Sequence, residues 1–188
     1  MSFNSYCQEK LELKKLGFSM DVPKDWISIN EDAIIKNLNR YDFTDKQLNE
    51  LLKSNNSAVN ISSYTKYDPK KHKGIIPTIK IRTIFNPTKN SADFLKYVEA
   101  SNESGKKALD NFKFIEKPII IKISNQDVVK FSLKFSLKNA GDIYEIVSNS
   151  YYIPKNGYYI SLNFIEQIGK ENNKQLFEKL IKSIQLTE

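Results

Sequence analysis

The sequence predicts an α+β fold, namely an α/β/α sandwich around a mainly antiparallel sheet. Apolar and polar residues alternate almost throughout residues 112–165, which is typical of four consecutive strands joined by short turns. Helical periods occur early at 30–56, in the middle of the chain at 90–100, and at its end at 172–184. Because the strands follow one another in sequence, we expect them to pair antiparallel, with the helices packed on the sheet.

The first half of the chain predicts further strands and two helices. Residues 17–29 have the pattern of a strand, a turn at Pro23–Asp25 and a short second strand. Asn30 is expected to cap a helix, because acidic residues follow it at the positive helix end. The remaining elements expected here are a helix at 42–56, a strand at 58–64, a charged loop at 66–74 and a long strand at 75–85.

Two more helices are expected in the second half. One is capped by Asn90 and Ser91 and is expected to run to Ala100, because the following Ser-Asn-Glu-Ser-Gly run indicates its end. The other closes the chain and carries its apolar residues on one face: Leu176, Phe177, Leu180, Ile181 and Ile184. No linker divides the chain, so residues 11–188 are expected to form one domain.

Residues 1–10 are expected to be a disordered tail or the remnant of an export signal. Residues 2–8 resemble the end of a signal peptide, with small and polar residues just before a Gln-Glu start, although no basic and apolar regions precede them. We therefore expect an exported protein, periplasmic or secreted. A frayed terminus of a cytoplasmic protein and lipidation of Cys7 are the alternatives.

The positive charge indicates a lysine-rich surface rather than a nucleic-acid interface. Of 29 basic residues only Arg40 and Arg82 are arginine, and the net charge is +7. Base and phosphate recognition favour the planar guanidinium group, so no specific nucleic-acid partner is expected. The longest uncharged run, 54–65, has twelve residues, and the more apolar run 156–165 has ten. A bilayer requires about 20, so no transmembrane segment is expected.

No arrangement of residues predicts catalysis, a metal or a cofactor. His72 is the only histidine and lies among lysines, and Cys7 is the only cysteine, so neither a Ser-His-Asp nor a Cys-His group is expected. Gly105 lacks the second glycine and the hydroxyl of a phosphate-binding loop. Paired carboxylates such as Glu31 and Asp32 are explained more simply by a helix N-terminus.

Two segments carry a resemblance to a known superfamily. Residues 18–26, FSMDVPKDW, resemble the opening of the PsbP/Mog1-like superfamily, an apolar strand followed by a proline turn and an aromatic residue. Residues 158–164, YYISLNF, with the helix that follows, are similar to its close. The resemblance covers residues 17–186 and implies an α/β/α sandwich. The helices expected between 30 and 57 are longer than the family pattern.

The resemblance also implies a class of function. Members include extrinsic photosystem proteins, nuclear-transport regulators, bacterial lipoproteins and secretion-system chaperones, which are mostly binding or assembly proteins. We therefore expect a PsbP-related bacterial exported protein, a non-catalytic binding or accessory protein of the periplasm or envelope. A cytosolic chaperone or adaptor of the secretion-chaperone branch is the alternative. A hydrolase that uses acid and base carboxylates is a third class.

Strand register predicts which face would bind a partner. Apolar residues at odd positions from 129 to 137 alternate with Lys and Ser and are expected to face the core. A tight turn at Ala140–Gly141 would place Leu137 opposite Tyr144. A two-residue loop within 154–157 would place Ile160 opposite Tyr151 and mix the faces. A three-residue loop with a bulge would keep the apolar residues inside, so we expect the bulge.

The outward face would then be a polar, aromatic and cationic platform for a protein or anionic partner. Its rows would be Lys130–Tyr151–Ser161 and Ser132–Asn149–Asn163. The predicted binding residues are Lys122, Lys130, Ser132, Lys134, Asn149, Tyr151, Ser161 and Asn163. A plain solvated sheet face is the alternative.

Overall fold

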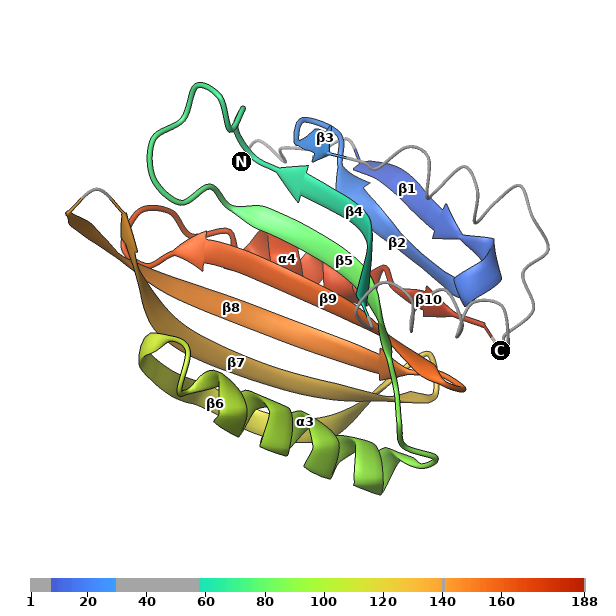
Figure 1. Cartoon of the computed structure of the whole chain (residues 1–188). Helices are drawn as coiled ribbons and strands as arrows, with labels where there is room; N and C mark the ends of the chain where they lie inside the picture. The colour runs from blue at the N-terminus through green and yellow to red at the C-terminus, as the bar shows by residue number, and fades with distance from the viewer. Residues whose placement is uncertain (1–7, 30–57, 140, 188) are drawn as a thin grey trace.

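The computed structural model describes residues 8–29, 58–139 and 141–187 (Figure 1). The two helices expected between residues 30 and 56 lie outside the described residues, as do residues 1–7. The elements in chain order are β1 (Gln8–Leu13), a 3-10 helix η1 (Lys14–Leu16), β2 (Phe18–Pro23), β3 (Ile27–Ile29), β4 (Ala58–Thr65), β5 (Thr78–Phe85), α3 (Ser91–Gly105), β6 (Asp110–Ile123), β7 (Gln126–Asn139), β8 (Asp142–Pro154), β9 (Tyr158–Gln167), α4 (Lys174–Lys182) and β10 (Gln185–Leu186).

The described strands form two sheets. The larger has seven strands in the order β3-β4-β5-β9-β8-β7-β6, and the smaller has three in the order β1-β2-β10. Every pairing in both sheets is antiparallel, which confirms the mainly antiparallel sheet predicted from the alternation. The run from β6 to β9 confirms the four consecutive strands expected at 112–165.

Helices α3 and α4 lie on opposite faces of the large sheet, which gives the layered α+β architecture (Figure 1). On the α3 face, Phe94 and Val98 of the helix pack against Phe131 and neighbouring side chains. On the α4 face, Phe177 and Leu180 join the main core with residues of β2, β4, β5 and β9. The small sheet therefore shares the outer layer with α4.

Two element boundaries differ from the sequence prediction. Residues 8–10 belong to β1 and pair with β2, so they are not part of a tail. Helix α3 continues to Gly105 rather than ending at Ala100. Side chains that often end helices instead bond back within it: Asn102 donates to the Val98 carbonyl (2.9 Å) and Ser104 to the Ala100 carbonyl (3.2 Å).

The connection between β8 and β9 is a two-residue turn, Asn156–Gly157. The Lys155 amide donates to the Tyr158 carbonyl (2.8 Å), and Gly157 has a φ of 80°, which favours glycine. Ile160 consequently lies opposite Ile153. The expected bulge register, with Ile160 opposite Tyr152, is wrong by one residue. A shift of one residue moves every side chain of a strand to the other face relative to its neighbour.

Candidate functional site

The structure divides the predicted binding residues between the two faces of the large sheet. Five lie on the α4 face, because β7 and β8 pair as predicted, with Lys130 opposite Tyr151 and Ser132 opposite Asn149. The eight predicted binding residues therefore do not form one platform. The residues on the α4 face are Lys130, Ser132, Lys134, Asn149 and Tyr151, whereas Lys122, Ser161 and Asn163 lie on the α3 face.

The three residues on the α3 face are placed there by their partners. Ser161 lies opposite Tyr152 and Asn163 opposite Ser150, so both predicted rows are wrong at their third member. Both side chains are buried. Lys122 lies opposite Asp127 and forms an ion pair with it at 2.7 Å. A hydrogen bond from Lys122 is the main reason that the pKa of Asp127 lies below its usual value.

The five residues on the α4 face, together with Lys113, form what we call the polar strip. Lys130 pairs with Glu116 of β6 at 2.8 Å, and this hydrogen bond raises the pKa of the lysine. Ser132 donates a hydrogen bond to the Asn149 side-chain oxygen (2.8 Å). Lys113 lies directly opposite Lys134 on the neighbouring strand. Within the described part of the chain neither of these two lysines has a carboxylate partner, so the strip keeps uncompensated positive charge.

Strand β6 borders the polar strip and is the outermost described strand of the large sheet. Its 14 residues include Ile115, Ile119 and Ile120, which are 55%, 50% and 38% exposed. An outermost strand presents backbone N–H and C=O groups that no neighbouring strand bonds. This edge therefore exposes apolar side chains, and no other strand of the described residues pairs with it.

The α3 face carries a second polar region on β5 and β9, beside the area that the helix covers. Lys80 and Arg82 project from β5 opposite Asn163 and Ser161 of β9. The floor is hydrogen-bonded: the Ser150 hydroxyl donates to the Asn163 oxygen (2.9 Å), and the Asn163 amide donates to the Ser161 hydroxyl (2.8 Å). Asn163 thus completes a buried chain of polar groups.

Two tyrosines, Tyr152 and Tyr159, lie close enough to Arg82 on that face to interact with its charge. Tyr152 has a raised pKa chiefly because it is buried, and the positive charge of Arg82 opposes this effect. Burial, with the neighbouring Tyr152 and Tyr97, raises the pKa of Tyr159 well above its usual value, and Arg82 opposes this effect too. The region that we call the β5–β9 polar face consists of Lys80, Arg82, Ser150, Tyr152, Tyr159, Ser161 and Asn163.

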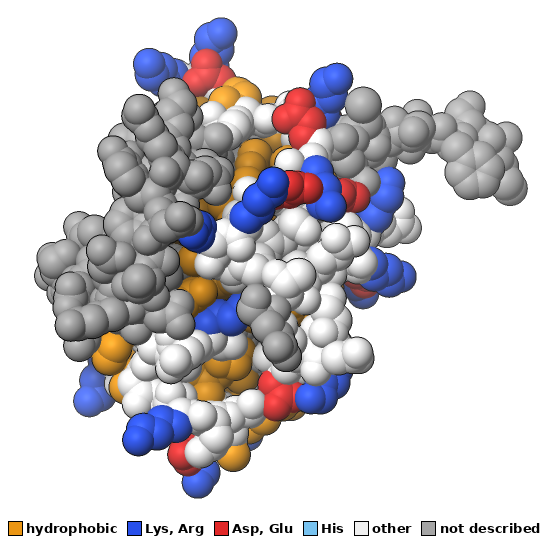
Figure 2. All heavy atoms as spheres, turned by 90° about the vertical axis from the view of Figure 1, so that its right-hand side faces the viewer, with side chains coloured by type: hydrophobic (Ala, Val, Ile, Leu, Met, Phe, Trp, Pro, Cys, Tyr) orange, Lys and Arg blue, Asp and Glu red, His pale blue; other side chains and the backbone are white. Residues whose placement is uncertain are grey.

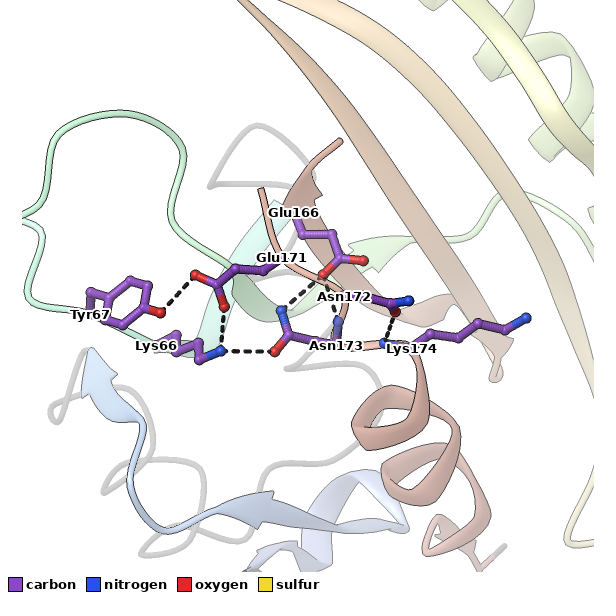
Figure 3. Close-up of polar contacts among 7 residues, drawn as sticks. All are labelled: Lys66, Tyr67, Glu166, Glu171, Asn172, Asn173 and Lys174. Atoms are coloured by element: carbon purple, nitrogen blue, oxygen red, sulfur yellow. Dashed lines mark hydrogen bonds and ion pairs between the residues drawn. The ribbon is translucent and has the colours of Figure 1, made fainter. Parts of the chain in front are cut away.

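A third polar cluster joins the β4–β5 loop to the β9–α4 loop (Figure 3). The Lys66 ammonium forms an ion pair with Glu171 and donates to the Asn173 side-chain oxygen (3.2 Å). The Tyr67 hydroxyl donates to Glu171 (2.7 Å). The buried Glu166 carboxylate accepts from the Asn173 side-chain amide (2.9 Å). Each charge in this cluster has a partner, which is typical of a structural clasp between loops.

The clasp adjoins two small cavities. One, of about 130 Å³, is lined by His72, Lys73, Ile75, Pro77, Gln167, Lys170 and Glu171. The other, of about 520 Å³, lies along residues 166–172 and Val147. His72 lies in the loop between β4 and β5, as expected, and stacks on the Tyr67 ring with centroids 4.7 Å apart. Among the described residues, no group of three or more His, Cys, Asp and Glu could hold a metal ion.

Basic side chains do not gather into one patch on the side of the molecule shown in Figure 2. Lys and Arg residues are scattered there and interspersed with Asp and Glu. Counterion release by nucleic acid favours a continuous basic surface, which this side does not present. Of the helices in the described ranges, none is long and apolar enough to cross a membrane.

Sequence comparison identifies no relative: no family model matches the chain, and no curated protein sequence matches it. Comparison with solved structures gives matches. LpqN of Mycobacterium tuberculosis, which is involved in cell envelope biogenesis, has a TM-score of 0.51 at 12% identity, over 98% of this chain and 93% of LpqN. The Saccharomyces cerevisiae Ran-binding protein Mog1p has a TM-score of 0.50 at 9% identity, over 97% of this chain and 96% of Mog1p.

A protein of Bacteroides thetaiotaomicron VPI-5482 is also similar in structure, with a TM-score of 0.49 and 12% identity. The match covers 95% of this chain but 48% of that protein, so the chain spans about half of its length. The likeness to LpqN and Mog1p shows that this chain has the Mog1/PsbP-like fold, as the sequence resemblance predicted. At these identities it shows the fold alone.

Lys80, Arg82, Lys113 and the Lys66–Glu171 clasp were not predicted as site residues. The alternation of Lys80 and Arg82 with Ile79 and Ile81 is visible in the sequence and places both cations on one face. The clasp joins residues 105 positions apart, and no local pattern indicates such a contact.

Proposed function

We propose that this protein is a non-catalytic accessory protein that binds an extended, acidic segment of a partner protein at the β6 edge and the polar strip. The observation that carries the proposal is the open edge of β6 with its exposed isoleucines. An extended peptide can add a strand to such an edge, because main-chain hydrogen bonds supply affinity and side-chain contacts supply specificity. Exposed apolar side chains beside polar ones are typical of interaction surfaces.

The charge of the polar strip favours an acidic segment. Lys113 and Lys134 lie directly opposite each other, and like charges in that position destabilise a sheet. A carboxylate on an added segment would compensate both lysines. A second copy of this chain is less well suited, since its own β6 would bring further lysines to the same edge.

Location in the envelope is part of the proposal. It is supported by the signal-like residues 2–8 and by the fold shared with LpqN, which is involved in cell envelope biogenesis. A cytosolic adaptor is the second candidate, because Mog1p, with the same fold, binds the protein Ran. Fractionation of cells that carry the natural gene separates the two. Recovery of the protein wholly in the cytosol would contradict export and leave the adaptor.

Site-specific photo-crosslinking in those cells tests the binding edge. A photoreactive residue at position 119 of β6 should give a discrete crosslinked product with a second protein, and Ile115→Lys combined with Ile120→Lys should remove it. A photoreactive residue in place of Ile143 is the matched control, because this isoleucine is 62% exposed but lies on β8. Equal products at both positions, or a product that contains only this chain, would contradict the proposal.

A further inference from the structure

We propose that the β5–β9 polar face binds a phosphate group, either as inorganic phosphate or as a small phosphate monoester, between Lys80 and Arg82. This site is on the α3 face and is separate from the proposed partner edge, so either proposal can fail alone. The reason for proposing it is that two cations lie on this face and the rest of the described structure gives them no counter-charge.

The register shows that carboxylates are missing from this region. Lys80 and Arg82 are two residues apart on β5 and project to the same side, each partly buried. On the described strands β4, β5, β8 and β9, the α3 face presents a single carboxylate, Asp142, which is the first residue of β8 and lies ten residues before Tyr152. Across the residues that the structure covers, neither cation has an ion pair or a hydrogen-bond acceptor.

Two other partly buried lysines are each compensated by a carboxylate. Lys66 pairs with Glu171, and Lys130 pairs with Glu116. By contrast, burial and the neighbouring charge of Arg82 both lower the pKa of Lys80. The Nε atom of Arg82 is buried and has no hydrogen-bond partner. A buried donor without an acceptor is costly, so this pair of cations is incomplete without an anion.

The surrounding groups favour phosphate over a single carboxylate. Two cations match an anion that carries close to two charges, and the guanidinium group binds oxyanions with two parallel hydrogen bonds. The floor consists of uncharged side chains, Ser150, Ser161 and Asn163, whose hydrogen bonds to one another hold them in place. Tyr152 and Tyr159 add hydroxyl groups without adding negative charge.

The test is a titration of the full chain with inorganic phosphate, with glycerol phosphate and with acetate, each at the same ionic strength in chloride. We expect saturable binding of phosphate or glycerol phosphate by calorimetry, with acetate at least tenfold weaker. Tighter binding of glycerol phosphate would identify a monoester as the ligand, and tighter binding of inorganic phosphate would identify the free ion. The resonance of the Lys80 side chain should show its pKa rise when the anion binds.

Variants distinguish this site from general attraction to lysines. Lys80→Met and Arg82→Met should each weaken phosphate binding at least tenfold, and Lys134→Met is the matched control, because Lys134 is an uncompensated lysine of the polar strip. Removing either cation relieves a like-charge contact, so both variants should fold and melt no lower than the parent in chloride. No saturable phosphate binding, or an equal loss in the control, would overturn the proposal. Crosslinking at position 119 should be unchanged in either variant.

Discussion

Tyr151 lies directly opposite Leu162 across β8 and β9, and its ring meets the edge of Phe164 with centroids 6.1 Å apart. The residue therefore stands at the border between the α4-side core and the polar strip. Its ring packs against the core cluster, while the residue opposite it on β7 is Lys130. Burial is the main reason that the pKa of Tyr151 is raised. The side chain is thus a core component as well as a surface one.

Tyr151→Ala should lower the free energy of unfolding by about 2–3 kcal/mol, because truncation of a packed aromatic leaves a cavity. Tyr151→Phe should change it by less than about 0.5 kcal/mol, since the described residues offer the hydroxyl no hydrogen-bond partner. Urea unfolding measures both. An alanine variant as stable as the parent would show that the ring contributes only to the surface.

Asn163→Ala should lower the free energy of unfolding by about 2–3 kcal/mol. Asn163 is 6% exposed and joins the Ser150 and Ser161 hydroxyls, so its removal leaves buried polar groups unpaired. Asn149→Ala is the control on the other face, where a partly exposed side chain accepts one bond from Ser132. Its expected cost is about 1 kcal/mol. Equal costs for the two variants in urea would contradict this account of the faces.

The register of the β7–β8 hairpin could be predicted from the sequence, whereas that of the β8–β9 hairpin could not, and the reason is local. Asn139 and Asp142 pair across a turn of two residues, and from that turn the whole β7–β8 register could be predicted, including Lys130 opposite Tyr151. The stretch 154–157 contains both a proline and a glycine, so several loop lengths fit it. The loop length is decided by the burial of Leu162 and Phe164 in the core, which is a tertiary contact. The predicted binding residues fell on two faces of the sheet because their placement depended on that loop length.

Gly17→Ala should destabilise the fold by about 2 kcal/mol or more. Gly17 ends η1 with a φ of 56°, a region that costs other residues about 1–2 kcal/mol. A Cβ atom there would also collide with the Thr187 carbonyl. Gly105→Ala is the control, because its Cβ would only touch Phe112 and it lies in a helix. Alanine at 105 should be neutral or stabilise by up to about 1 kcal/mol. Thermal melts that rank the variants in the opposite order would contradict the prediction.

The Lys66–Glu171 clasp should make stability depend on pH. Burial alone would raise the pKa of Glu171, but hydrogen bonds from Lys66 and Tyr67 outweigh it and hold the pKa below its usual value. A carboxylate with a depressed folded-state pKa stabilises the fold above its unfolded-state pKa of about 4.3, and this contribution is lost as the pH falls through the folded value. Burial would lower the pKa of Lys66, but Glu171 outweighs it and raises it, so that contribution is lost only at high pH.

Glu171→Gln should therefore cost about 1 kcal/mol at pH 7, and the difference from the parent should vanish below about pH 3. Urea unfolding from about pH 3 to pH 8 measures this difference. Glu178→Gln is the control, because Glu178 is exposed and pairs with Lys174 at 3.9 Å. That change should cost less than about 0.5 kcal/mol at any pH. A Glu171 difference that stays constant with pH would show that the carboxylate charge is not what stabilises the clasp.

Lys113→Glu should raise stability and weaken partner binding at the same time. The change converts the like-charged Lys113–Lys134 pair into an opposite-charged one, which is expected to stabilise the sheet by about 0.5 kcal/mol. The same change removes the positive charge that we propose to attract an acidic segment, so crosslinking from position 119 should fall several-fold. Lys96→Glu on the exposed side of α3 is the control and should leave crosslinking unchanged. If Lys113→Glu raises stability and leaves the crosslink unchanged, the lysine pair does not contribute to partner binding.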